Sequence, residues 1–150
     1  MRPVASSVST VALLCLAACA GPAIQLEPAP TSADQPLAFE VRDWDWNRSS
    51  FELTLRVTNH GDRVVMLERG FLALNDGDRS MAPTSRPQTC KIAPRGSRTV
   101  YLKYPAVDEQ VSVLTVEFGA GALRFDDKEG EPLEVPPLRL LVGEPARPAR

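Results

Sequence analysis

The stretch FELTLRVT, residues 51–58, constrains the fold of this chain more than any other part of its sequence. Its apolar residues Phe51, Leu53, Leu55 and Val57 alternate strictly with polar ones. Successive side chains of a β-strand point to opposite faces, so eight residues of alternation are typical of a strand with one buried and one solvated face. The period is two, rather than the 3.6 residues of a helix.

The same period recurs later in the chain. In SRTVYLKYP, residues 97–105, an apolar residue at every second position again predicts a strand, and Pro105 ends it. QVSVLTVEFG, residues 110–119, is a further strand, but its apolar phase slips between Val113 and Leu114. This strand is therefore either buried on both faces or bulged.

Turn signals separate these strands. Phe71 and Ala73 indicate a strand that ends at Asp76-Gly77, a pair suited to a type I′ hairpin. Short apolar pairs within residues 123–125, 133–135 and 138–142 close the chain. The 14 prolines weigh against long helices. We predict an all-β fold, an immunoglobulin-like antiparallel β-sandwich of seven or eight strands.

The N-terminal segment carries the signals for export. An apolar run from Val8 to Ala20 is too short to span a bilayer and follows a single positive charge, as in a secretory signal. It ends in Leu16-Ala17-Ala18-Cys19, which resembles the lipobox of bacterial lipoproteins. That resemblance implies cleavage before Cys19 and fatty acylation of this residue. Simple secretion is the alternative.

The export signal divides the chain into four parts. We expect a lipoprotein signal peptide at 1–18, a lipidated Cys19 with a proline-rich linker at 19–36, the sandwich at 37–142 and an unfolded tail at 143–150. Removing residues 1–18 takes away one arginine, so the formal charge changes from −2 to −3. This near-balance argues against a nucleic-acid partner. Of three cysteines, only Cys90 then remains in the folded part.

Three segments carry a family resemblance. LTLRVTNHGD with Asn59, FLALNDG over 71–77 and APRGSRTVYLKYP with its turn at 94–96 follow one another in order. Together they resemble the immunoglobulin-like accessory domain of unknown function found in many bacterial lipoproteins and secreted antigens, with one residue inserted in the turn. Late-embryogenesis-abundant-like domains have a similar strand–Asn–turn pattern. Both families imply a sandwich, and neither supplies catalytic residues to carry over.

The segment RDWDWNR, residues 42–48, is the candidate binding face. Trp44 and Trp46 share one face of an extended chain, although the apolar phase has changed after Phe39 and Val41. One interpretation is a bulge that turns both indoles into the core. The other places them on the surface, where aromatic rings hold a sugar or a partner chain.

Metal binding is the alternative function. Met66, Met81 and His60 are candidate ligands for Cu(I), because thioethers are soft ligands. The acidic loops at 75–78 and 126–131 are candidates for Ca²⁺, although neither has the spacing of a calcium-binding loop. Buried methionines and solvated turns explain the same residues without a metal.

The sequence predicts a binding or structural module rather than an enzyme. His60 is the only histidine, and the Cys90 thiol lies about 30 residues away in no nucleophile motif. We therefore assign no catalytic residue, metal ligand or cofactor. The expected protein is anchored by lipid to the bacterial envelope, and Ala20 after Cys19 favours the outer membrane, facing the periplasm. Its expected partner is another envelope protein or cell-wall glycan.

Replacement of Cys19 tests the anchor. We expect Cys19→Ser to abolish acylation and cleavage by the lipoprotein route, because the thiol is the attachment atom. Partitioning of wild type and variant between detergent and aqueous phases measures this. A wild type that stays in the aqueous phase, or a variant that partitions as the wild type does, would contradict the prediction.

Overall fold

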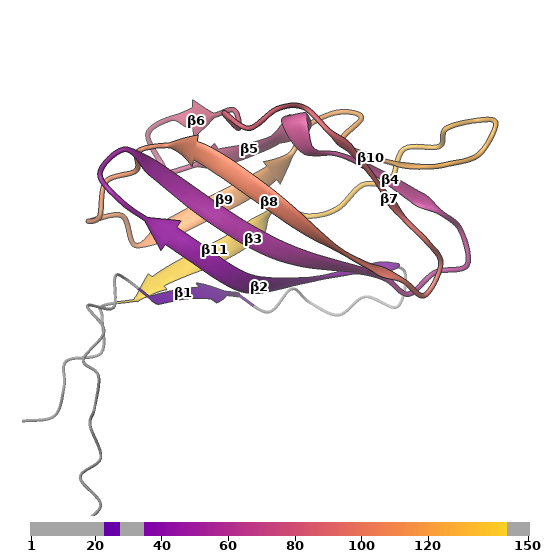
Figure 1. Cartoon of the computed structure of the whole chain (residues 1–150), viewed down its shortest axis with the longest axis horizontal. Coiled ribbons are helices and arrows are strands. Elements are labelled where there is room, and N and C mark those ends of the chain that lie inside the picture. The colour runs from indigo at the N-terminus through magenta and orange to yellow at the C-terminus, as the bar shows by residue number, and fades with distance from the viewer. Residues whose placement is uncertain (1–22, 28–34, 144–150) are drawn as a thin grey trace, which may run out of the picture.

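The computed structural model describes residues 23–27 and 35–143, which form an antiparallel β-sandwich. One layer is a five-stranded sheet in the order β1-β11-β9-β5-β6. Its strands are β1 (Ala23–Leu26), β11 (Leu138–Gly143), β9 (Val113–Phe118), β5 (Leu72–Asn75) and β6 (Ser80–Met81). The predicted all-β sandwich is confirmed (Figure 1).

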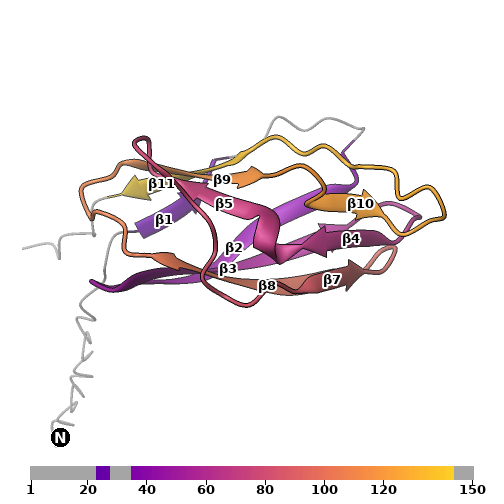
Figure 2. The same ribbon diagram turned by 90° about the horizontal axis from the view of Figure 1, so that it is seen from above.

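A three-stranded sheet faces this layer, and a third sheet lies at one end of the sandwich (Figure 2). The facing sheet has the order β2-β3-β8, with strands β2 (Leu37–Trp46), β3 (Ser50–Asn59) and β8 (Ser97–Pro105). The end sheet has the order β10-β4-β7, with strands β10 (Leu123–Phe125), β4 (Val65–Glu68) and β7 (Thr89–Ile92). A single 3₁₀ turn (Arg69–Phe71) separates β4 from β5.

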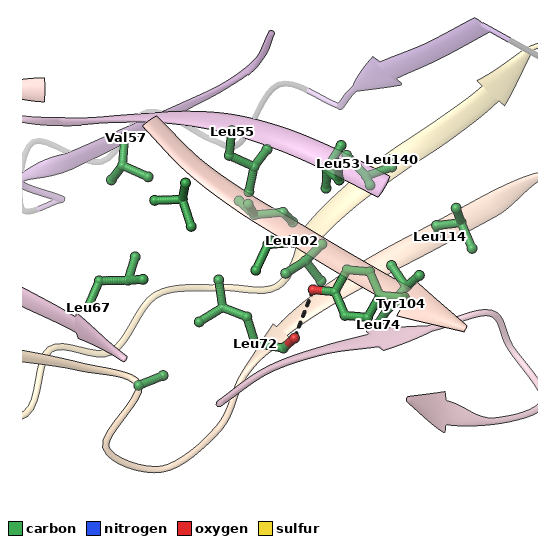
Figure 3. Close-up of a cluster of buried hydrophobic side chains, with 14 of the residues drawn as sticks. Leu53, Leu55, Val57, Leu67, Leu72, Leu74, Leu102, Tyr104, Leu114 and Leu140 are labelled. Atoms are coloured by element: carbon green, nitrogen blue, oxygen red, sulfur yellow. Dashed lines mark hydrogen bonds between the residues drawn. The ribbon is translucent and has the colours of Figure 1, made fainter. Parts of the chain in front are cut away.

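The core lies between the two large sheets. The four apolar residues of β3 predicted to face inward are at most 1% exposed, and β8 contributes Val100, Leu102 and Tyr104. Leucines of the opposite layer meet them, and Figure 3 shows this cluster. Tyr104 is fully buried, and its hydroxyl donates a 2.8 Å hydrogen bond to the Leu72 carbonyl oxygen. Burial raises the pKa of this phenol well above its usual range.

Several local predictions need correction. Phe71 lies in the 3₁₀ turn and is 53% exposed, so the inward residues of β5 are Leu72 and Leu74. The turn after Asn75 is not type I′, because Gly77 is its only residue with a positive φ. The Asp76 carboxylate accepts hydrogen bonds from the N–H groups of Asp78 and Arg79. Residues 133–135 form no strand, although Pro132 makes an isolated bridge with Arg124 and the Leu133 N–H donates to the Leu123 carbonyl oxygen at 3.0 Å.

The sandwich also begins and ends outside the predicted limits. Ala23–Leu26, which we placed in the linker, form β1 and pair with residues 140–143 of β11. Ile24 is only 6% exposed, so this strand adds a side chain to the core. Gly143, which we placed in the tail, is the last residue of β11. Strand β9 has no bulge in its pairing, and Leu114 and Val116 are its buried residues.

Asn59 fixes the end of β3 to two turns. Its side chain is fully buried, and its amide nitrogen donates to the carbonyl oxygens of Arg63 at 2.7 Å and of Ile92 at 3.2 Å. Its amide oxygen accepts the N–H of Gly61 at 3.0 Å. One side chain therefore satisfies three backbone groups that water does not reach freely.

We expect Asn59→Leu to destabilise the fold by about 2–4 kcal/mol, because a side chain of similar size leaves those backbone groups without partners. Thr58→Val is the matched control, since Thr58 is half-buried on the other face of β3 and its hydroxyl bonds only Ser97. Denaturant unfolding measures both. Equal losses in the two variants would show that Asn59 does not have this role.

Candidate functional site

A groove of about 800 Å³ opens along one side of the sandwich, between the edge strands of its two layers. The strands β1 and β2 form its walls, and residues 135–139 complete the lining. Its apolar lining comprises Ile24, Leu26, Leu37, Phe39, Val41, Val135 and Leu138. The volume lies within the range of pockets that hold small ligands or peptide side chains.

Polar residues form the rim of the groove. Glu27 is paired with Arg139 at 2.9 Å, and Glu40 is paired with Arg42, also at 2.9 Å. His60 lies on the rim and is exposed. Because both carboxylates have cationic partners within the protein, the rim adds little uncompensated charge beside the apolar lining.

The strand β2 gives the groove a second property. It lies at the edge of its sheet and pairs only with β3 among the described strands. A strand with one neighbour leaves alternate backbone N–H and C=O groups without a ladder partner on its other side. The groove therefore combines an apolar wall with a row of backbone hydrogen-bonding groups.

A bulge divides β2 into two halves. The register shifts between Val41 and Asp43, so that Phe39, Val41, Trp44 and Trp46 all face inward. The bulge that we considered for RDWDWNR is thus present. Beyond it, charged side chains cover the outer face of the strand, whereas the half from Leu37 to Val41 lines the groove.

The two tryptophans pack against the core and are both half-buried. The Trp46 indole N–H donates a 3.0 Å hydrogen bond to the Val107 carbonyl oxygen, and its ring meets Phe51 edge-on at 5.2 Å. These contacts explain Trp46 as part of the structure. A binding role for Trp44 and Trp46 stays a prediction.

The structure does not gather the candidate Cu(I) ligands. Met81 is buried on β6, whereas Met66 is half-buried on β4 between two residues, Val65 and Leu67, that face the core. Neighbouring residues of a strand point to opposite faces, so the two thioethers face different surroundings. His60 lies on the groove rim instead.

The acidic loops are engaged by basic groups of the protein. Asp127 and Glu131 both bind the Arg63 guanidinium, the latter at 3.0 Å, and this guanidinium lies 3.7 Å from the centre of the Phe125 ring. Hydrogen bonding to Arg63 lowers the pKa of the Asp127 carboxyl. The backbone N–H groups of Arg79 and Asp78 lower the pKa of Asp76 in the other loop.

Over residues 23–27 and 35–143, no three His, Cys, Asp or Glu side chains lie close enough together to hold a metal ion. Cys90 is a half-buried free thiol on β7, opposite Leu67 of β4. No helix within the described part of the chain is long and apolar enough to cross a membrane. The lipobox residues 16–19, including Cys19, lie outside the described residues.

Sequence reasoning missed the groove because its β1 wall was assigned to the linker. The stretch AIQL did carry a signal, since Ile24 and Leu26 are two residues apart, but the prolines around it hid the strand. No family model matches this chain, and no curated protein matches its sequence. The resemblance to an immunoglobulin-like accessory domain therefore has no support beyond the segments that suggested it.

Proposed function

We propose that this chain is a lipid-anchored protein of the bacterial envelope, and that its sandwich is a non-enzymatic binding module. The groove between β1 and β2 takes an extended apolar segment of another envelope protein. The sequence Leu16-Ala17-Ala18-Cys19 supports the anchor, and Ala20 favours the outer membrane with the sandwich in the periplasm. The observation that carries the binding role is an apolar groove beside an edge of β2 with which no other described strand pairs.

An extended peptide fits this groove better than other classes of ligand. Its backbone pairs with the free edge of β2 from Leu37 to Val41, and every second side chain then enters the apolar space. A lipid chain fills the space but leaves the backbone groups of β2 without partners. A sugar ring needs polar side chains and a flat aromatic face, whereas the lining is mostly aliphatic.

A synthetic peptide of alternating valine and threonine is the probe for this role. We expect it to bind the full chain, purified in detergent, and Phe39→Ser to weaken that binding by about tenfold, because the variant removes a half-buried ring from the groove wall. Fluorescence anisotropy of the labelled peptide measures the affinity. Tyr101→Ser is the matched control, since Tyr101 is 63% exposed on β8, away from the groove.

Two further ligands separate the proposal from its rivals. The same peptide with N-methyl groups on its pairing edge must bind much more weakly if backbone pairing to β2 matters. Equal binding of the methylated peptide would reject strand pairing. Binding of a cell-wall glycan fragment that is lost in Trp44→Ala but kept in Phe39→Ser would instead assign the function to the tryptophans.

A further inference from the structure

The strand β1 is held firmly in the sandwich, although it stands in a proline-rich part of the sequence. It pairs with β11 over four residues, and Ile24 inserts into the core. Beyond the strand, the Glu27 N–H donates to the Arg139 carbonyl oxygen at 2.8 Å, and the two side chains form a 2.9 Å ion pair. Residues 23–27 are therefore attached to β11.

This placement shortens the tether to the lipid. Only residues 20–22 separate Cys19 from Ala23, which limits the distance between the two Cα atoms to about 14 Å. If residues 20–36 were all a free spacer, Cys19 and Leu37 could be about 60 Å apart. We propose that β1 acts as a tether lock that holds one end of the sandwich against the membrane surface. The inference rests on the proposed lipid on Cys19.

The structure identifies which end this is. Figures 1 and 2 both place the start of β1, the end of β11, the β2–β3 turn and the β8–β9 connection together. Two hydrogen bonds agree: the Val142 N–H donates to the Ser112 carbonyl oxygen at 2.9 Å, and Trp46 donates to Val107 at 3.0 Å. We call this the lipid-facing end, made up of Ala23, Gly143, residues 47–49 and residues 106–112.

The charges at the two ends of the sandwich do not explain this orientation. The loop 126–131 lies at the opposite end (Figure 1), and its carboxylates Asp126, Asp127 and Glu131 are paired with Lys91 and Arg63, so repulsion from anionic headgroups does not set the orientation. The lipid-facing end carries Arg48 but also Asp108 and Glu109, so attraction to anionic lipid does not hold it in place. The orientation depends on the short covalent tether, and added salt should leave it unchanged.

Energy transfer from Trp44 and Trp46, the two tryptophans of the chain, to a dansyl lipid measures the separation without a label on the protein. The acylated full chain is placed in vesicles of phosphatidylethanolamine and phosphatidylglycerol that contain dansyl-phosphatidylethanolamine. We expect strong transfer in the wild type. Ile24→Asp should reduce it by roughly half or more, because a buried carboxylate expels β1 and lengthens the tether. Gln25→Asp is the control, since Gln25 is exposed on the same strand.

A second variant keeps β1 in place. A Gly/Ser insertion of about 14 residues between Gly21 and Pro22 adds about 20 Å of reach and must also reduce transfer, even if Ile24→Asp fails to fold. Equal transfer in the wild type and the insertion variant would overturn the tether lock and leave the anchor intact. A wild type that does not associate with vesicles would overturn the lipid anchor itself, and the tether lock with it.

Discussion

Burial of one face of β3 is the constraint on which the rest of this structure depends. The strand lies between β2 and β8, and its four inward side chains are almost completely removed from solvent. Each such side chain stabilises the fold by about 1.5–3 kcal/mol relative to exposure. That face cannot be covered within its own sheet. The opposite layer, with Leu72, Leu74, Leu114 and Leu140, is required to cover it.

Two sheets that cover each other still have edge strands. The functional proposals depend on one of these edges, that of β2. The bulge and the charged residues after Val41 protect half of the β2 edge from association with other strands. The half from Leu37 to Val41 has a regular register and a single charged residue, Glu40, and it faces β1 across the apolar groove. β1 thus forms a wall of the groove, and under the proposed lipid anchor it would also set the length of the tether. In these proposals one short strand links the binding groove to the membrane anchor.

Sequence predicted the parts of the fold in which local pattern and burial agree. The strands β3 and β8 alternate strictly, and their inward residues were assigned correctly. Where tertiary packing determines the conformation of a segment, the sequence alone did not predict it. Phe71 was predicted to lie in a strand, but it belongs to a 3₁₀ turn, and the strand that follows has Leu72 rather than Phe71 as its first inward residue. Proline at 136 and 137 limits the pairing of this segment with β10 to the bridge at Pro132 and the hydrogen bond of Leu133. The groove could not be predicted from the sequence, because it forms between β1 and β2, which belong to different sheets and lie side by side at one edge of the sandwich.

Hydrogen exchange of the backbone amides of β1 and of Glu27, the residue that follows it, tests the central claim most directly, namely that this strand belongs to the sandwich. The Glu27 amide donates to Arg139 in the structure, so in the full chain it should exchange more slowly than in an unstructured peptide by about tenfold or more. The amides of β11 that pair with β1 should lose protection when Ile24→Asp releases the strand. Exchange of the Glu27 amide at the rate of an unstructured chain would show that β1 is free, and would remove both the groove wall and the short tether.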